Sequence, residues 1–389
     1  MLRCVGLYTC EVDDPGIALS QLRTQLSEKM ELMENTVGIV MCHTEFIDSG
    51  VLKHVAENLP FEIAGVTTSV QAVNDKVSEM VLTVFVMTSD TVRFRVGITD
   101  SMEDDIERPL REALARVGED SGQPGLILSF PPIMLKNSGD DIMEVWGRIL
   151  PGVPVFGGLA ADDSADLAGG RVICRNEISN IRQAFVLCYG DINPRFLIAT
   201  VPEENKLPHK GEITKSNRNI VEEIDGRSAR DYLKGVGFAV EGESLGIFWF
   251  VPFLISQRSR KDYDGVPVVR GLASTTKEGS AVFRGRMDEG SVFTLLNMTG
   301  EDVVAETGAK LRSMKDMPDV NGILLFSCVV RHMLLIHNNP LEEMQTAKDT
   351  LCGPQFMMGY VGGEFCPTSN KDGLHVNRFH NYSLVGLVI

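Results

Sequence analysis

Apolar and polar residues follow one another along this chain in an order that repeats. In the first half, an amphipathic stretch with helical spacing precedes a short apolar run; a second such pair follows, and then two apolar runs separated by a polar turn. Apolar residues three or four positions apart predict helices, whereas short apolar runs bounded by turn residues predict buried strands. The pattern predicts units of helix, strand, helix, strand and hairpin.

Four such units are predicted along the chain. Their first strands are expected at residues 37–42, 125–130, 245–251 and 322–327, and a glycine lies at the end of each second strand: Gly65, Gly157, Gly271 and Gly359. A position that admits only a small residue beside a turn would explain these glycines. The third unit matches least well, because a charged loop at residues 256–264 replaces its middle helix.

A polar segment with two prolines, residues 202–210, interrupts the pattern halfway. Such segments are typical of domain boundaries. We therefore expect an α/β protein with two domains, residues 1–205 and 206–389, each with a mixed sheet flanked by helices. The hairpins would add antiparallel strands beside the parallel ones.

Composition narrows the function classes. A net charge of -16 without a basic cluster argues against binding to nucleic acid or to an anionic membrane surface, since phosphates would be repelled. The apolar stretches are too short to span a bilayer, so we expect no membrane insertion. Eight cysteines are spread over the chain without a Cys-x-x-Cys pair, which predicts a cytoplasmic protein with reduced thiols and no structural metal.

Charged residues of both signs follow the apolar runs near the C-terminus. Arg331 comes shortly after the run at residues 322–327, and Glu364 follows a Gly-Gly pair. A guanidinium suits a carboxylate and a carboxylate suits an ammonium, so the two side chains would recognise a zwitterion such as an amino acid. The alternative is an internal salt bridge between two strand ends.

Other polar residues are candidates for the same ligand site. Asp162 and Asp163 follow the turn at Gly157 and Gly158, where they would bind a ligand or a hard cation, or cap the turn. Near the C-terminus, His380 and Asn381 would hydrogen-bond a ligand or tie the last strand to its neighbour.

Cys328 raises the question of catalysis. A thiol at a strand end can act as a nucleophile when a histidine lies nearby in the fold. The chain has no known Cys/His signature around it, no G-x-S-x-G and no phosphate-binding glycine loop. We expect a buried structural cysteine and no enzyme; an enzyme that acts on a small metabolite through Cys328 is the alternative.

Several motifs in one order resemble the FIST family, with its N-terminal and C-terminal domains. The resemblance covers nearly the whole chain and is carried by residues 154–163, 326–331, 363–364 and 380–383. It implies a cytoplasmic sensory module that relays ligand binding to a histidine kinase of a two-component system or to a chemotaxis component. Small ligands such as amino acids are implied. Ser383 stands where the family pattern has Thr, which keeps the hydroxyl.

Some members of the family resemble haem-binding nitric oxide sensors. Seven histidines offer axial ligands here, without a Cys-x-x-Cys-His motif, and His332 is the candidate. The sequence therefore predicts a ligand sensor that needs no certain cofactor, with a haem sensor as a second reading.

Overall fold

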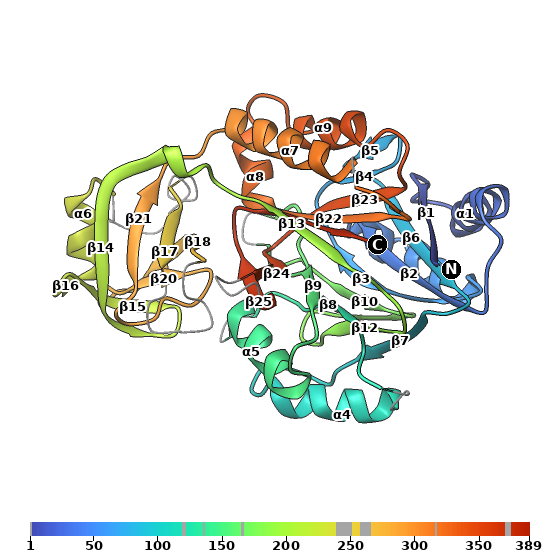
Figure 1. Ribbon diagram of the computed structural model, residues 1–389, viewed down its shortest axis with the longest axis horizontal. Helices are drawn as coiled ribbons and strands as arrows, with labels where there is room; N and C mark the ends of the chain where they lie inside the picture. Colours follow the sequence, from blue (N-terminus) through green and yellow to red (C-terminus); the bar gives the residue numbers. More distant parts are fainter. Residues whose placement is uncertain are drawn as a thin grey trace.

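Three six-stranded mixed sheets form the body of the protein, and a smaller antiparallel lobe stands beside it (Figure 1). The computed structural model describes residues 2–118, 122–134, 137–164, 167–238, 251–256, 266–315, 317–369 and 375–389. Among these residues, no helix is both long and apolar enough to cross a membrane.

The strands follow the same spatial order in each of the three sheets. The first runs β1 (Leu2–Thr9), β6 (Leu82–Ser89), β2 (Asn35–Cys42), β3 (Glu62–Thr67), β10 (Val172–Cys174), β11 (Glu177–Ser179). The second runs β7 (Arg93–Ile98), β12 (Ala184–Tyr189), β8 (Leu126–Phe130), β9 (Val155–Gly158), β24 (Glu364–Ser369), β25 (His375–His380). The third runs β13 (Arg195–Ala199), β26 (Leu384–Val388), β22 (Ile323–Cys328), β23 (Phe356–Val361), β4 (Gln71–Val73), β5 (Lys76–Ser78).

Each sheet contains one parallel pair whose strands are joined through helices. The pairs are β2 with β3, β8 with β9, and β22 with β23. The joining helices are α2 (Glu45–Asp48) and α3 (Val51–Asn58), α5 (Gly139–Ile149), and α8 (Val329–Leu335) and α9 (Glu342–Thr350). A further helix precedes each pair: α1 (Pro15–Lys29), α4 (Glu107–Val117) and α7 (Gly300–Lys315).

The hairpin of each unit pairs with the sheet of another unit. Strand β4 lies beside β23, β10 beside β3, and β24 beside β9, so the exchange closes a ring of three. The helices and parallel strands of predicted units one, two and four therefore recur in the body. The hairpins expected at 81–98 and 184–201 are wrong, because the two strands of each join different sheets: β6 pairs with β1 and β2 but β7 with β12, and β12 pairs with β7 and β8 but β13 with β26.

The third predicted unit is different. Helix α6 (Ala229–Gly235) packs on strands that are all antiparallel: β14 (Lys206–Asn217), β15 (Ile220–Ile224), β16 (Arg227–Ser228), β17 (Phe253–Ser256), β18 (Val268–Arg270), β19 (Leu272–Thr275), β20 (Ala281–Phe283) and β21 (Val292–Leu296). The prediction of a fourth equivalent unit is wrong for the described part of this lobe. Most of the expected strand at 245–251 and of the charged loop at 256–264 lies outside the described residues.

The predicted boundary at residues 205/206 coincides with the point where the chain enters the lobe at β14. After β21 the chain returns to the body, where β22 to β26 share sheets with strands of the first half. Residues 206–389 are thus divided between the lobe and the body.

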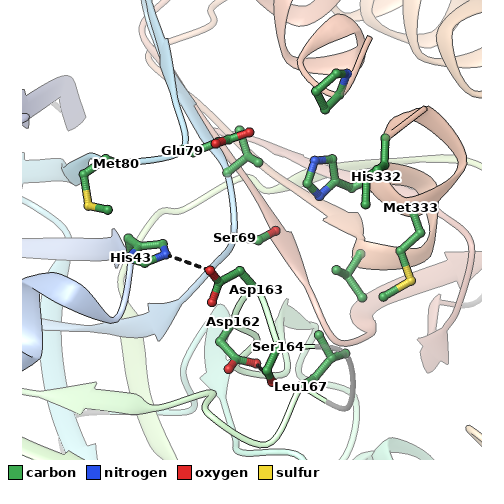
Figure 2. Close-up of a pocket in the computed structure, with 14 residues that line it drawn as sticks. His43, Ser69, Glu79, Met80, Asp162, Asp163, Ser164, Leu167, His332 and Met333 are labelled. Carbon is green, nitrogen blue, oxygen red and sulfur yellow. Dashed lines mark hydrogen bonds and ion pairs between the residues drawn. The ribbon is translucent and has the colours of Figure 1, made fainter. Parts of the chain in front are cut away.

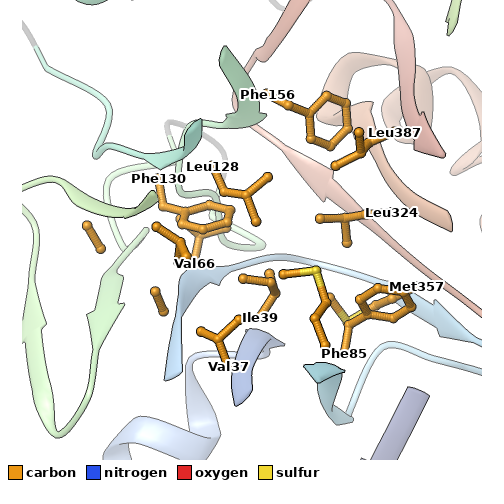
Figure 3. Close-up of a cluster of buried hydrophobic side chains, with 14 of the residues drawn as sticks. Val37, Ile39, Val66, Phe85, Leu128, Phe130, Phe156, Leu324, Met357 and Leu387 are labelled. Atoms are coloured by element: carbon orange, nitrogen blue, oxygen red, sulfur yellow. The ribbon is translucent and has the colours of Figure 1, made fainter. Parts of the chain in front are cut away.

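The core lies where the inner faces of the three sheets meet (Figure 3). Phe326 of β22 packs against Phe130 of β8 and Phe156 of β9, with ring centroids 6.2 and 5.4 Å apart. At two of the strand-end glycines, Gly65 and Gly157, a Cβ atom would overlap the carbonyl oxygen of Val40 or Ser129 on the neighbouring parallel strand. Close approach of the two strands therefore requires glycine there.

Side-chain caps mark the starts of two helices. Helix α1 begins after Asp14, whose carboxylate accepts from the N–H groups of Gly16 and Ile17. At the start of α5, the Asp141 carboxylate accepts from the Ser138 N–H at 2.8 Å. These side chains satisfy N–H groups that a helix leaves free, and they fix where the loops after the strands end.

Candidate functional site

A cavity of about 460 Å³, here called the body pocket, opens where strands of all three units end (Figure 2). His43 follows β2, Ser69 follows β3, Asp162 follows β9, and His332 lies in α8 directly after β22. The carboxyl ends of parallel strands are the usual place for ligand sites in α/β folds, and this volume fits a small molecule.

The described residues that line the body pocket carry carboxylates and imidazoles but no Lys or Arg. Asp162 is buried and accepts from the Ser164 hydroxyl at 2.9 Å. Asp163 is 66% exposed, with its Oδ2 3.4 Å from His43 Nε2. Glu79 lies on the opposite side of the pocket in Figure 2. The pocket therefore attracts cationic groups.

Two polar groups in this pocket are buried without a hydrogen-bond partner among the described residues: His332 Nε2 and Ser69 Oγ. Figure 2 shows both side chains pointing into the cavity. The His332 ring stacks on Tyr360, with ring centroids 4.7 Å apart, and burial lowers its pKa, so the imidazole is neutral at neutral pH. Buried polar groups are seldom left unsatisfied, which points to a hydrogen-bonding molecule in this space.

A smaller cavity of about 20 Å³, here called the inner cavity, adjoins the body pocket through Leu167 and Val329, which line both. Cys328 and Asn381 also line it. The carboxyl group of Glu364 is fully buried beside the Cys328 thiol and the Ser383 backbone, and within the described part of the chain neither oxygen makes a hydrogen bond of good geometry.

Burial raises the pKa of Glu364 well above its usual range, by more than the nearby Cys328 thiol and Arg331 guanidinium lower it. Burial therefore favours the protonated form of this carboxyl group. Burial likewise raises the pKa of the Cys328 thiol, which is 2% exposed, so little thiolate forms.

The predicted pairing of Arg331 with Glu364 is wrong. Arg331 is fully buried, and its Nε and Nη2 donate to the Glu343 carboxylate at 3.0 and 2.8 Å. Nη1 donates to the Tyr382 carbonyl, and Nη2 also reaches Thr307. The alternative prediction of an internal salt bridge at Arg331 is right in kind, but the partner is Glu343 of α9 and not Glu364. Every nitrogen of the guanidinium already donates to an acceptor.

Of the other predicted residues, some line a cavity and the rest pair within a sheet. Asp162, Asp163 and His332 line the body pocket, and Cys328 and Asn381 line the inner cavity. Gly157 and Gly158 pair with Phe365 and Glu364 in the sheet, and Glu364 pairs in turn with His380.

His380 is bound to its own sheet. Its Nε2 lies 3.1 Å from the Cys366 carbonyl oxygen, and burial lowers its pKa to about 3. The interpretation that His380 ties the terminal strand to its neighbour agrees with this contact.

His43, Ser69 and Glu79 were not predicted as site residues. His43 stands directly after the apolar run at 37–42, and Ser69 lies two residues after β3. The rule that pointed to Arg331 applies equally to these positions, so strand-end polarity in the first unit was the missed signal.

The described residues contain no group of three or more His, Cys, Asp or Glu side chains placed to hold a metal ion. The charges of the residues that line the body pocket do not suit haem. Its two propionates need cationic or donor groups, whereas the described lining residues include Glu79, Asp162 and Asp163 and no Lys or Arg.

Two family models match the chain. The model of the FIST N domain matches residues 36–227, and that of the FIST C domain matches residues 230–367. The junction between the matches falls in the lobe, at the start of α6. No curated protein matches the sequence.

Proposed function

Because the chain belongs to the FIST family, whose domains are associated with sensory signal transduction, we propose that the body pocket is the sensory site and binds a small molecule with an amino group on an apolar body. The observation that carries this proposal is the pair of unpartnered groups, His332 Nε2 and Ser69 Oγ, beside the acidic wall.

The amino group follows from the charge of the lining. An ammonium group placed near the buried Asp162 carboxylate would gain a charge-assisted hydrogen bond. Val70, Leu167 and Val329 supply apolar walls for the rest of the ligand. The pocket supports the ammonium half of the amino acid that the resemblance implies, but its described lining offers no guanidinium for the carboxylate half.

Two alternatives are less well supported. The haem sensor would use His332, and the acidic lining opposes the propionates. An enzyme acting through Cys328 would need a thiolate, and burial of that thiol raises its pKa. We therefore propose binding without catalysis.

Helix α8 offers a route for the signal. Its residues Val329, His332 and Met333 line the body pocket, while Val330 and Leu335 belong to a buried cluster with Val269 of the lobe. A ligand that favours one position of α8 would therefore bias the lobe, provided that its affinity differs between the two states. A histidine kinase or chemotaxis component as the recipient, and the cytoplasmic location, stay predictions.

Benzylamine tests the proposal, because it joins an ammonium group to a compact apolar ring. Titration of protein with ¹³C-methyl-labelled methionine would follow Met80 and Met333, which line the body pocket, after assignment with Met→Leu variants. We expect both resonances to shift, and Ser69→Ala to weaken the response. Equal shifts with neutral benzyl alcohol would contradict recognition of the ammonium group.

A further inference from the structure

Three polar side chains that line the body pocket come from three different units of the body: Ser69 from the first, Asp162 from the second and His332 from the fourth. Figure 2 shows Ser69 and His332 pointing into the same cavity. We propose that the ligand of this site is an amine with a second, uncharged group that both donates and accepts hydrogen bonds, as in an amino alcohol. This inference rests on the proposed function and adds the second group to it.

An ammonium group satisfies only one of the three side chains. It carries N–H donors and no acceptor, and Asp162 is the buried carboxylate of the described lining. The Ser69 hydroxyl, on a residue that is 5% exposed, has no hydrogen-bond partner among the described residues, and neither has His332 Nε2. A hydroxyl needs an acceptor for its own proton, which an ammonium group does not supply. A second group of the ligand is therefore required.

The second group is uncharged. A carboxylate would lie among Glu79, Asp162 and Asp163, and the described lining contains no Lys or Arg to offset the repulsion. The His332 imidazole does not offset it either, because burial lowers its pKa and keeps it neutral. A ligand hydroxyl can serve either tautomer of this imidazole, since it donates to a bare Nε2 and accepts from a protonated one.

Tyr360 of β23 holds both unpartnered groups in place. Its ring is fully buried and stacks on the His332 ring, with centroids 4.7 Å apart and planes 15° apart. Its backbone N–H donates to the carbonyl of Val70, the residue after Ser69, at 3.3 Å. The two groups are thus positioned before any ligand arrives, which favours a partner of matching geometry.

Asp162 is tied to the same strand end as Ser69. The Ala161 N–H donates to the Thr67 carbonyl at 3.0 Å, and the Thr67 hydroxyl donates to the Ala161 carbonyl at 2.7 Å. Asp162 follows Ala161 directly, and Ser69 lies two residues after Thr67. These bonds bring the carboxylate and the hydroxyl to one side of the pocket, so the two polar groups of the ligand should lie on neighbouring carbon atoms.

Three amines with the same benzyl group test this assignment. Phenethylamine, phenylalaninol and phenylalanine differ at the carbon that bears the nitrogen, which carries a hydrogen atom, a hydroxymethyl group or a carboxylate. Titrations that follow Met80 and Met333 in the methionine-labelled protein measure their affinities. We expect phenylalaninol to bind about tenfold more tightly than phenethylamine, because its hydroxyl satisfies buried groups. Phenylalanine should bind more weakly than phenethylamine, because its carboxylate is repelled.

Two variants assign the preference to the named groups. Ser69→Ala removes the hydroxyl, and His332→Phe removes Nε2 but keeps a ring that can stack on Tyr360. Each should reduce the preference for phenylalaninol over phenethylamine to about threefold or less. The matched control is Ser27→Ala, which removes an exposed hydroxyl from α1 and should keep the full preference.

The experiment separates failure of this inference from failure of the proposed function. If none of the amines shifts Met80 and Met333, the proposed function is wrong and the inference fails with it. If phenethylamine shifts both methionines but phenylalaninol binds no more tightly, the amine site stands and the second group is wrong. Phenylalanine binding as tightly as phenylalaninol, or a full preference in both variants, would overturn the inference in the same way.

Discussion

The body pocket and the lobe cleft, a cavity of about 280 Å³ between the lobe and the body, both lie where parallel strands end, yet different kinds of charged residue line them. The body pocket is lined by Glu79, Asp162 and Asp163, whereas Arg284 is the charged group of the cleft in the described lining. The repeated sheet order places both cavities, and the residues of the loops after the strands decide what each one binds.

The comparison also shows how a fold can neutralise an acidic sequence locally. Asp140 and Asp141 directly follow two residues that line the cleft, Ser138 and Gly139, whereas Asp162 and Asp163 themselves line the body pocket. The difference is that Arg270 and Arg286 of the lobe pair with the first two. The lobe thus supplies both the wall of the cleft and the cations that remove its negative charge.

The largest expected effect comes from breaking this pairing. Asp140→Ala would leave the fully buried Arg270 without its carboxylate, which should lower the free energy of unfolding by about 3–5 kcal/mol. Urea unfolding measures this loss. Glu144→Ala on the same helix, which removes a partly exposed partner of Arg148 and Arg286, should cost about 1 kcal/mol or less.

A substitution of Glu364 tests whether burial keeps the proton on this carboxyl group near Cys328. Its folded-state pKa is raised, so the folded protein holds this proton more tightly than the unfolded chain does. Stability is then complete below about pH 4.5 and falls as pH rises from there through the folded pKa. Glu364→Gln removes this loss and should be more stable than the native protein at pH 8.5, by on the order of 1–3 kcal/mol.

Urea midpoints at pH 5 and pH 8.5 measure the effect of Glu364→Gln. The gap between the two proteins should narrow at pH 5, where the native carboxyl group is protonated in the folded state. A gap that is the same at both pH values would mean that Glu364 does not titrate as its burial requires.

A smaller effect is expected from removing one charge of the body pocket. Asp162→Asn keeps an oxygen that can accept from Ser164 but removes the negative charge. Benzylamine affinity should fall about tenfold, a loss of about 1.4 kcal/mol, because a charge-assisted hydrogen bond becomes a neutral one. The Met80 and Met333 titrations measure it, and the Met134 resonance should stay unchanged, because Met134 lines the other cavity.

The smallest effect is expected at Asp163. This carboxylate is 66% exposed and pairs with His43 at 3.4 Å, so solvent screens its charge. Asp163→Asn should change benzylamine affinity less than about threefold and stability by less than about 0.5 kcal/mol. An effect as large as that of Asp162→Asn would show that the ligand approaches the outer rim of the pocket and not its buried wall.

Much of the fold could be predicted from local patterns. The caps at Asp14 and Ser138 start α1 and α5, and the strand-end glycines Gly65 and Gly157 lie where a parallel neighbour approaches. These features depend on residues close in sequence or on one steric constraint. The exchange of hairpins could not be predicted, because an apolar pattern shows which face of a strand is buried but not which strand lies beside it.

The site was predicted only in part for the same reason. Asp162 and His332 were found because they follow apolar runs, and His43 and Ser69 could have been found by that rule. The partner of Arg331 could not be predicted. Glu343 points inward from α9, a helix that is polar along most of its sequence, so no local pattern distinguishes this buried carboxylate from the exposed ones. The cleft depends on contacts between α5 and the lobe, which no local pattern records.

One measurement tests the contrast between the two cavities most directly: titration of the methionine-labelled protein with benzylamine. The account predicts that benzylamine shifts Met80 and Met333, which line the body pocket, and leaves Met134, which lines the lobe cleft, in place. It is contradicted if benzylamine shifts Met134 instead, or if neutral benzyl alcohol shifts Met80 and Met333 equally.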